Sequence, residues 1–539
     1  MSTVGVTISG AAEAAAAEHV PTLVADGFAS RLFAGDATLW GPQAEEESAK
    51  RLGWVGLHRT SRPLVGEVAA LKADLDEHAP YDRVVLCGMG GSSLAPEVIC
   101  ATAGVPIVIL DSSDPDVVRG ALTDLERTVV VVSSKSGSTV ETDSQKRVFE
   151  GAFTAAGIDP TSRIIIVTDP GSPLDASARA AGYRVVNADP MVGGRFSALT
   201  AFGLVPSGLA GADIEQLLDD AEAIADTLAA DSESNPALML GAAMAGTAPL
   251  RDKLVLVDDG TENRGFGAWA EQLIAESTGK SGTGILPVVA DGGAPHRMYA
   301  DGLVVRLVAT DRDEDVPADG TGVIVDGSLG AQFLLWEVAT AVAGRLLGIS
   351  PFDQPDVESA KAAARELLDA GIGAGAAPAY TDGAVEVHAL GGDWLGEAVT
   401  LDEAVEALLS ELDPDHGYIA VMAYLDREAD APFESVARAL FERTGRPCTF
   451  GWGPRFLHST GQYHKGGPAT GVYLQVTRTP REDLSIPGRE FTLGQFIAAQ
   501  AGGDAAVLAD HGRPVLRLHL TDPESGLRQV SDLLGGAAR

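Results

Sequence analysis

Residues 127–142, RTVVVVSSKSGSTVET, join a run of valines to a turn rich in hydroxyl side chains. Consecutive valines are typical of a strand that is buried on both faces, as in a parallel sheet between helices. Gly137 permits a tight turn after that strand, and a helix is expected to begin near Thr139. Such a turn offers hydroxyl and backbone N–H donors to one anion, although serines also start helices without binding any ligand. The stretch therefore predicts an α/β unit, with or without a phosphate site.

The alternation of strand and helix extends through the first half of the chain. Apolar runs separated by helical patterns occupy 83–87, 105–110, 127–132, 162–168 and 183–187. Continuous apolar strands in this arrangement indicate buried parallel strands joined by helical crossovers. We therefore predict a doubly wound α/β subdomain.

A helical stretch over 212–246 separates this subdomain from a second one. Further apolar runs follow at 252–258, 301–310 and 321–326, and the same texture continues to the C-terminus. The predicted fold class is α/β, with two doubly wound parallel-sheet subdomains and a C-terminal α/β segment. The predicted divisions are 1–211, an N-terminal helical lead-in with the first subdomain, then 212–365 and 366–539.

The composition limits the functions that the chain can have. With 76 acidic and 39 basic residues the formal net charge is -37, so the surface should repel nucleic acid and anionic membranes. The N-terminus lacks the pattern of a signal peptide, and no apolar stretch is long enough to span a bilayer. The cysteines have no metal-ligand spacing. We therefore expect a cytoplasmic protein that binds neither nucleic acid nor membrane and holds no metal.

Five motifs follow one another between residues 88 and 361. They are GMGGSSL at 88–94, SKSGSTVET at 134–142, GGRFSALTAFGLVP at 193–206, EQLIAESTGK at 271–280 and PFDQPDVESAK at 351–361. The first does not complete the dinucleotide pattern G-x-G-x-x-G, because Ser93 stands in its last position. In this order the motifs resemble those of the phosphoglucose isomerase (glucose-6-phosphate isomerase) family, which implies that both subdomains have the sugar-isomerase (SIS) fold. The chain also resembles the isomerase half of fused transaldolase–isomerase proteins.

The resemblance implies an enzyme that interconverts glucose 6-phosphate and fructose 6-phosphate through an enediolate, in glycolysis and gluconeogenesis. Moving a proton between C2 and C1 of a sugar phosphate needs a carboxylate base and cationic or N–H donors, and it requires no cofactor. Two alternatives stay open, a sugar-phosphate-sensing module without catalysis and an isomerase that also accepts mannose 6-phosphate. The resemblance further implies a homodimer with sites completed across the interface, and a sugar phosphate as the small-molecule partner.

Roles for individual residues also follow from the resemblance. Glu276 is expected to be the base, Arg195 to stabilise the enediolate, and Lys361 to assist ring opening. Gln272 lies one helical turn before Glu276, so spacing alone places both on one face of a helix. The other expected substrate-binding residues are Gly91, Ser92, Ser134, Lys135, Ser136, Thr139, Glu141, Gly194 and Gln354.

The ring-opening histidine departs from the pattern of the family. Many members place it between the fourth and fifth motifs, where this chain has only His296, in GGAPHRMYADG. The later stretch FLHSTGQYHKGG at 456–467 resembles the histidine helix of some bacterial members. We favour His458 for this role, with His464 and His296 as alternatives.

The segment 366–539 is extra relative to short members of the family. Only 82 residues precede the first predicted strand, which is too few for a transaldolase barrel of roughly 200 residues or more. We predict that the extra segment is structural and also delivers His458 and Lys465 to the site.

Overall fold

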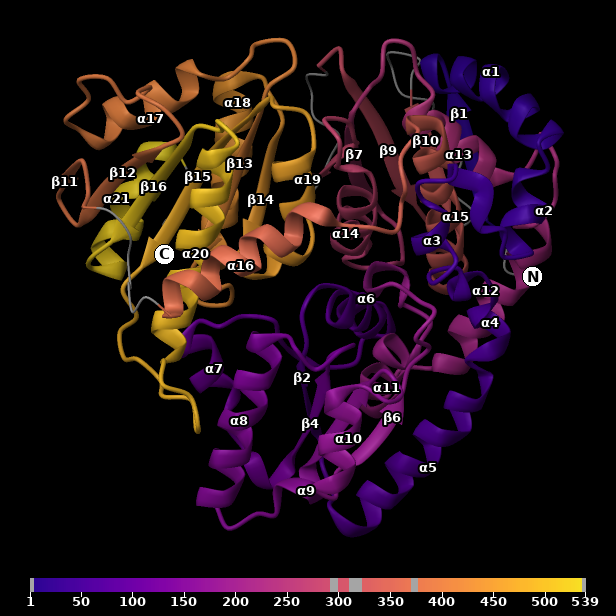
Figure 1. The fold of residues 1–539 in the computed structure, drawn as a ribbon, viewed down its shortest axis with the longest axis horizontal. Helices are drawn as coiled ribbons and strands as arrows, with labels where there is room; N and C mark the ends of the chain where they lie inside the picture. Colours follow the sequence, from indigo (N-terminus) through magenta and orange to yellow (C-terminus); the bar gives the residue numbers. More distant parts are fainter. Residues whose placement is uncertain (1–3, 291–298, 310–321, 370–376, 536–539) are drawn as a thin grey trace.

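The computed structural model describes residues 4–290, 299–309, 322–369 and 377–535, which form three open sheets with helices packed on their faces (Figure 1). Neighbouring strands are parallel in most of each sheet, which confirms the predicted α/β class. In the described part of the chain, no helix is both long and apolar enough to cross a membrane.

The first sheet contains the strand that ends in the hydroxyl-rich turn. Its strands are β2 (Arg83–Cys87), β3 (Val108–Leu110), β4 (Thr128–Ser133), β5 (Ile164–Thr168) and β6 (Arg184–Asn187). Their order is β3-β2-β4-β5-β6, with every pair parallel. Strands β4 and β5 are buried along their whole length, which explains their unbroken runs of β-branched residues. The helices around this sheet include α5 (Arg62–His78), α6 (Leu94–Ala103), α7 (Pro115–Ala121), α8 (Val140–Ala155), α10 (Pro173–Ala180) and α11 (Ala201–Ala210).

The second sheet is also largely parallel. Its strands are β1 (Gly5–Ser9), β7 (Lys253–Asp259), β8 (Leu286–Ala290), β9 (Gly302–Val308) and β10 (Gly322–Asp326). Their order is β1-β10-β9-β7-β8, and only β1 runs antiparallel to its neighbour. The helices of this subdomain include α1 (Ala11–Ala25), α12 (Ile214–Leu228), α13 (Pro236–Ala245), α14 (Phe266–Thr278) and α15 (Leu329–Leu347).

The N-terminus differs from the predicted helical lead-in to the first subdomain. Residues 5–9 form β1, an edge strand of the second sheet, and α1 packs against α13 of that same subdomain (Figure 1). A run of only five half-buried residues is too short for its pattern of apolar and polar residues to indicate a strand. Strand β8 is equally hard to recognise, because its sequence LPVVA is short and contains a proline.

The third sheet forms a C-terminal domain, by which we mean residues 377–535. Its strands are β11 (Tyr380–Asp382), β12 (Val385–Leu390), β13 (Tyr418–Tyr424), β14 (Cys448–Trp452), β15 (Gly471–Arg478) and β16 (Val515–Leu520). Their order is β11-β12-β16-β15-β13-β14, with the last four parallel to one another. The helices of this domain include α17 (Leu401–Ser410), α18 (Ser435–Thr444), α19 (Gly461–Gly466), α20 (Leu493–Asp510) and α21 (Pro523–Leu534).

Helix α16 (Pro355–Asp369) is the last element of the part of the chain that we call the N-terminal body (residues 4–369), and it leads into the C-terminal domain. It packs along α20 (Figure 1). Gln462 on α19 donates a 2.7 Å hydrogen bond to Asp356 Oδ2. Arg446 forms a buried two-pronged pair with Asp301, at 3.1 and 2.8 Å. Buried polar contacts therefore fasten the C-terminal domain to the body of the same chain.

Candidate active site

Two glycine-rich turns, which begin at Gly90 and Gly194, meet at the centre of the site. A Cβ on Gly91 would lie 2.0 Å from the carbonyl oxygen of Gly194. Gly90 has a φ of +55°, and a Cβ there would lie 2.9 Å from Cβ of His458. The close approach at both positions therefore requires glycine. Ser92 is half-buried in the same turn, and a Cβ on Gly194 would project into open space.

The hydroxyl-rich turn joins β4 to α8. Gly137 has a φ of +76°, and a Cβ there would lie 2.4 Å from Cβ of Leu174, so the turn requires glycine as predicted. Ser134 Oγ accepts a 3.1 Å hydrogen bond from the Gly137 N–H, while Ser136 is exposed. Thr139 is the N-cap, and within the described residues its side chain makes no capping hydrogen bond. The first turn of α8 therefore keeps backbone N–H groups for an anion.

Lys135 reaches from this turn to the loop after β5. Its Nζ lies 2.6 Å from Asp169 Oδ2 and donates a 3.3 Å hydrogen bond to the Pro190 carbonyl. Burial raises the pKa of Asp169, and the Lys135 cation opposes that shift. Part of the hydrogen-bonding capacity of this predicted ligand is therefore used within the protein.

Helix α14 carries Gln272 and Glu276 on one face, as their spacing predicts. Gln272 Nε2 donates a 3.1 Å hydrogen bond to Glu276 Oε2, and the two residues are only 3% and 7% exposed. Arg195 Nη1 lies 3.4 Å from Glu276 Oε1. A carboxylate and a guanidinium in contact within a buried site provide a base beside a stabiliser of negative charge.

Arg195 is held by acceptors at each of its nitrogens. Its Nε donates to Ser277 Oγ at 2.8 Å, Nη1 to Gln354 Oε1 at 2.5 Å, and Nη2 to the Pro351 carbonyl at 2.7 Å. Burial lowers the pKa of Arg195, whereas the Glu276 carboxylate opposes that shift. Because an arginine side chain stays charged in proteins, this group is a fixed cation that also positions the predicted ligand Gln354.

His458 closes the opposite side of the site. It ends a short 3-10 turn in the C-terminal domain, and its Nε2 lies 3.0 Å from Glu141 Oε1 at the start of α8. Gln272 Nε2 donates a 2.7 Å hydrogen bond to the His458 carbonyl, which joins the two halves of the site. Burial raises the pKa of Glu141, but the hydrogen bond and charge of His458 lower it, and the net shift is downward. The carboxylate therefore accepts a hydrogen bond from the imidazole and fixes its orientation.

Lys361 lies on the side of the site that contains Glu141 and His458. It lies on α16 and is half-buried, and its positive charge also lowers the pKa of Glu141. Together with the contacts of Arg195 and Gln272, this brings the four expected catalytic residues to one region of the molecule.

The alternative histidines differ from His458 in their surroundings. His464 is 2% exposed and lies among tyrosines, with its Nδ1 3.0 Å from the Tyr418 hydroxyl. Burial lowers the pKa of His464 to about 3, so its ring stays neutral. The structure does not bear out the prediction that Lys465 reaches the site. Its Nζ instead lies 2.5 Å from the buried Asp504, because a buried ammonium needs a counter-charge. His296 lies outside the described residues.

Three further residues support the site and were not among those predicted. Ser277 binds Arg195, and its position next to Glu276 in the fourth motif is a signal that could have indicated it. Gln500 on α20 donates a 2.8 Å hydrogen bond to Glu141 Oε1. Arg455 precedes His458 by one turn and pairs with carboxylates of the first subdomain. No local pattern marks the last two, because their partners are hundreds of residues away in the sequence.

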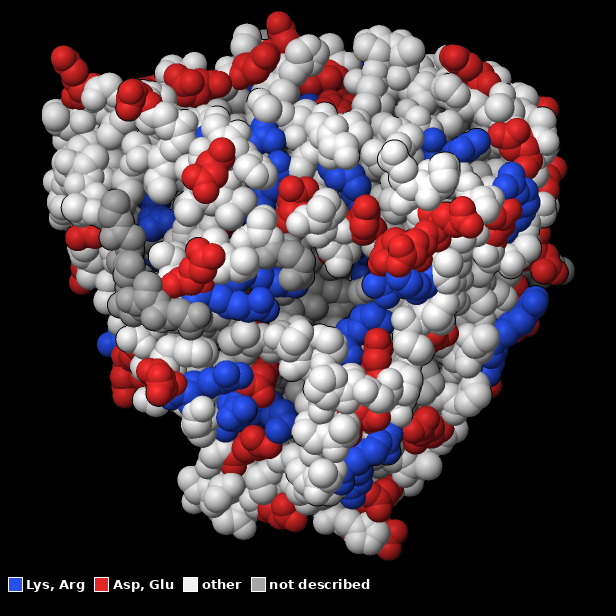
Figure 2. Space-filling model, viewed as in Figure 1, with Lys and Arg blue, Asp and Glu red and all other residues white. Residues whose placement is uncertain are grey.

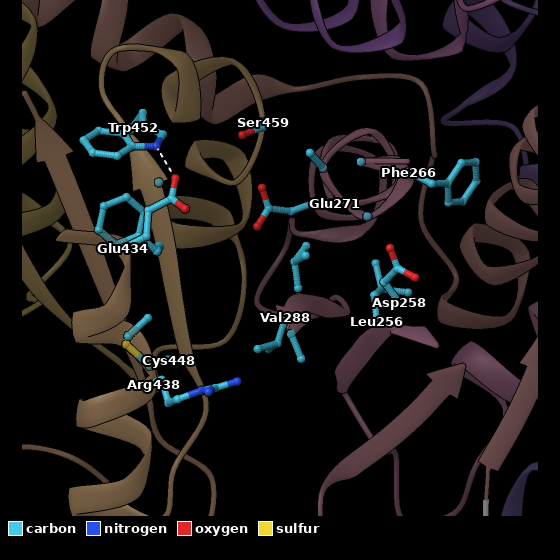
Figure 3. A pocket seen from close by; sticks show the side chains of 18 of the residues that line it. Leu256, Asp258, Phe266, Glu271, Val288, Glu434, Arg438, Cys448, Trp452 and Ser459 are labelled. Atoms are coloured by element: carbon cyan, nitrogen blue, oxygen red, sulfur yellow. Dashed lines mark hydrogen bonds between the residues drawn. The ribbon is translucent and has the colours of Figure 1, made fainter. Parts of the chain in front are cut away.

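A separate cavity of about 1350 Å³ lies between the second sheet and the C-terminal domain (Figure 3). Helix α14 and strand β8 line one side, and β14 and α18 line the other. Glu271 points into it from α14 (Figure 3), and burial raises the pKa of this carboxyl to about 8. Gln272, Glu276 and His458 are not among the described residues that line this cavity.

Basic side chains gather around a hollow near the middle of one face of the molecule (Figure 2). Figure 1 shows that the N-terminal body and the C-terminal domain meet there. The chain as a whole has a net charge of -37, so this local concentration of cations favours an anionic ligand at the junction.

The chain is similar to known proteins, although no protein-family model matches it. Over 361 residues the chain is 32% identical to a "Probable glucose-6-phosphate isomerase" of Natronomonas pharaonis, covering 56% of this chain and 84% of the relative. It is 31% identical over 346 residues to a "Glucose-6-phosphate isomerase" of Rubrobacter xylanophilus, covering 51% and 79%. A hypothetical protein of Thermus thermophilus shares the fold, with a TM-score of 0.56 and 24% identity over 68% of this chain and 100% of that one. The chain thus belongs to the glucose-6-phosphate isomerase family.

Proposed function

We propose that the protein is an aldose–ketose isomerase that interconverts glucose 6-phosphate and fructose 6-phosphate. The observation that carries this proposal is the buried contact of Glu276 with Arg195, at 3.4 Å. Gln272 links this pair to His458, because it donates hydrogen bonds to Glu276 and to the His458 carbonyl. The relatives from Natronomonas pharaonis and Rubrobacter xylanophilus are named for this activity. A sensing module would need the phosphate turn, but it would have no use for a buried carboxylate beside a guanidinium.

The phosphate group is proposed to bind at the hydroxyl-rich turn. Ser134, Ser136 and Thr139 would supply hydroxyl groups, and the first turn of α8 would supply N–H groups and the positive end of its dipole. Lys135 would add positive charge to this end of the site, shared with Asp169. The turn containing Gly91, Ser92 and Gly194 would then face the sugar.

The cyclic substrate must open before it isomerises. In that step the C1–O5 bond breaks, O5 takes up a proton, and the hydroxyl group on C1 loses its proton as the C1 carbonyl forms. His458 and Lys361 are the proposed acid–base groups. Because Nε2 of His458 faces Glu141, Nδ1 is the ring nitrogen that can meet a sugar oxygen.

Glu276 is proposed to transfer the proton between the two carbon atoms. It takes the proton from C2 of the open-chain aldose, and the electron pair forms the C1–C2 double bond of an enediolate with its charge on O1. A proton then passes from O2 to O1, and Glu276 returns its own proton to C1 as the C2 carbonyl forms. Arg195 stabilises the negative charge that develops on oxygen. The electrons stay within the sugar, so the reaction requires no redox cofactor.

Proton NMR in deuterated water tests this proposal, with fructose 6-phosphate as substrate and a metal chelator present. We expect glucose 6-phosphate to appear with deuterium at C2, because the enediolate exchanges its proton with solvent through Glu276. Sugar-phosphate binding without conversion would instead support the sensing alternative. A parallel search of the products for mannose 6-phosphate would show whether the enzyme also makes and accepts the C2 epimer.

We further propose a homodimer in the cytoplasm that acts in glycolysis and gluconeogenesis, as the family membership suggests. The acidic composition disfavours nucleic acid and membranes as partners. We retain 1–211, 212–365 and 366–539 as proposed divisions, with β1 and α1 assigned to the second subdomain because they pack there.

A further inference from the structure

Gln500 is a buried polar residue at the junction of the C-terminal domain and the first subdomain. It lies on α20 and is 4% exposed. Its Nε2 donates a 2.8 Å hydrogen bond to Glu141 Oε1, and its Oε1 accepts a 2.5 Å hydrogen bond from Ser113 Oγ. Ser113 is fully buried in the loop after β3. A single glutamine of one domain therefore bridges two segments of the other.

The chemistry of its partners fixes the orientation of this amide. An ionised carboxylate can only accept hydrogen bonds, so the NH₂ group of Gln500 must face Glu141. The carbonyl oxygen then faces the Ser113 hydroxyl, which can donate. Each polar atom of the buried Gln500 side chain is thus engaged, which favours one rotamer.

Glu141 Oε1 receives two donors, Gln500 Nε2 at 2.8 Å and His458 Nε2 at 3.0 Å. Since both bonds end on the same oxygen atom, the position that Gln500 sets for the carboxylate also determines where the imidazole lies. We propose that Gln500 is a positioning residue for ring opening, which acts through Glu141 to hold His458 with a proton on Nε2. This inference rests on the proposed isomerase function and assigns no contact between Gln500 and the substrate.

A matched control comes from a second buried glutamine nearby. Gln145 on α8 is fully buried, and its Nε2 donates a 2.9 Å hydrogen bond to the Ser112 carbonyl. It therefore ties the same loop to the same helix, but through the backbone and not through Glu141. Gln145→Leu should reproduce a loss of packing or of a buried hydrogen bond without moving the carboxylate.

The test compares Gln500→Leu, Gln500→Glu and Gln145→Leu with the wild type, using turnover of fructose 6-phosphate across pH. We expect Gln500→Leu to lower kcat about 10- to 100-fold, because a small misplacement of an acid–base group has effects of this size. Binding of D-glucitol 6-phosphate, which is acyclic and needs no ring opening, should stay as in the wild type. Gln145→Leu should keep kcat within about threefold of the wild type, an effect of no more than about 0.7 kcal/mol.

Gln500→Glu provides a readout that a purely structural role would not give. Two carboxyl groups in contact share a proton, and the shared proton lets residue 500 donate to Glu141 as the amide does. The kcat of this variant, relative to that of the wild type, should therefore be near 1 at low pH and should fall as pH rises. The same ratio for Gln500→Leu should be low at every pH.

Three results would overturn the inference: Gln500→Leu with wild-type kcat, an equal loss of kcat in Gln145→Leu, or parallel pH profiles for Gln500→Leu and Gln500→Glu. Each of these leaves the isomerase function standing, because it is judged against an active wild type. A wild type that binds fructose 6-phosphate without converting it would instead overturn the proposed function and the inference together.

Discussion

The N-terminal body and the C-terminal domain build the site in different ways. In the body, Gly137 forms the turn and its neighbour Thr139 lies at the proposed phosphate position, so one short sequence supplies both geometry and chemistry. In the C-terminal domain, His458 reaches Glu141 only because the whole domain docks against the body. Local sequence thus determines the first kind of ligand, and domain packing determines the second.

This difference separates the expected effects of substitutions. A change at Glu276 in the body should remove the group that moves the proton between carbon atoms, whereas a change in the C-terminal domain should remove or displace a group that prepares the substrate. Substitutions in the two regions should therefore differ in size of effect, and the largest is expected in the body.

Glu276→Gln should lower kcat by about 10³-fold or more, because a general base typically contributes 10² to 10⁴ to the rate and no other carboxylate contacts Arg195 in the described site. Affinity for sugar phosphate should persist. Deuterium exchange at C2 measures the effect directly, and Glu215→Gln on the exposed face of α12 is the control. If Glu276→Gln exchanged deuterium at C2 at the wild-type rate, Glu276 of the body would not be the base for proton transfer.

His458→Ala should lower kcat by about 10²-fold, because it removes one acid–base group from ring opening. The structure brings His458 to Glu141 within one chain, so each chain should contain a complete site. Mixing His458→Ala with Glu276→Gln under conditions that exchange subunits should then restore no activity.

The mixing experiment has a definite opposite outcome. If a homodimer completes each site across its interface, half of the dimers in an equal mixture would carry one intact site. Activity would then recover to about a quarter of the wild-type level. Such recovery would mean that His458 of each C-terminal domain contributes to the site of the partner chain. The two regions that build one site would then belong to two different subunits.

The predictability of the fold follows the same division. Strands β2, β4 and β5 were predictable because burial on both faces demands an unbroken apolar run. Strand β1 was not, since its five residues are half-buried and pair with a strand more than 300 residues away. Sequence patterns report local burial well, but they do not report which distant edge a short strand joins.

The predictability of the site divides in the same manner. Glu276 and Gln272 share a helix face that spacing alone defines, and the structure gives them a direct hydrogen bond. Only the resemblance to a known motif indicates His458, because its partner Glu141 is 317 residues away in the sequence. Gln500 has no such motif, and nothing in an alanine-rich helix distinguishes it from a glutamine exposed to solvent.

Arg455→Met should lower both stability and turnover. Its effect on turnover should be smaller than the effects of Glu276→Gln and His458→Ala. Arg455 lies in the 3-10 turn that ends at His458, and it pairs with Glu97 and, at 3.0 Å, with the buried Asp111. Removing one partner of a lone buried ion pair costs about 3–5 kcal/mol. Here the cost should be smaller, because Arg427 also pairs with Glu97 and, at 3.3 Å, with Asp111. We expect a lower melting temperature and a decrease in kcat of about 10-fold as the turn loosens.

Arg443→Met is the control for this substitution. Arg443 pairs with Glu406 inside the C-terminal domain, and these side chains are 31% and 60% exposed, compared with 13% and 1% for Arg455 and Asp111. Exposed pairs contribute about 0–1 kcal/mol, so this variant should melt close to the wild type and keep its kcat. Equal effects of the two substitutions would mean that the contact between Arg455 and the first subdomain does not position His458.

The smallest effect is expected from Glu271→Gln, which changes stability with pH. Burial raises the pKa of Glu271 to about 8, and the nearby Arg455 cation opposes the shift, while the ordinary value is 4.5. Between these values the folded protein holds a proton that the unfolded chain releases, so this contribution to stability is complete below pH 4.5 and is lost as pH rises through about 8. An amide stays neutral throughout, so the advantage of the variant in melting temperature should grow above pH 4.5 and level off above about pH 8.

The gain at high pH should be about 2 kcal/mol, less than the full shift implies because Glu271 lines a cavity between the two regions. Glu271→Leu should show the same pH-dependent gain, because it is also uncharged and differs only in hydrogen-bonding capacity. A gain in Glu271→Gln alone would assign the effect to a hydrogen bond of the amide. A pH-independent difference in both variants would mean that Glu271 is ionised in the folded protein at neutral pH. The boundary between the body and the C-terminal domain would then contain a half-buried charge close to Arg455.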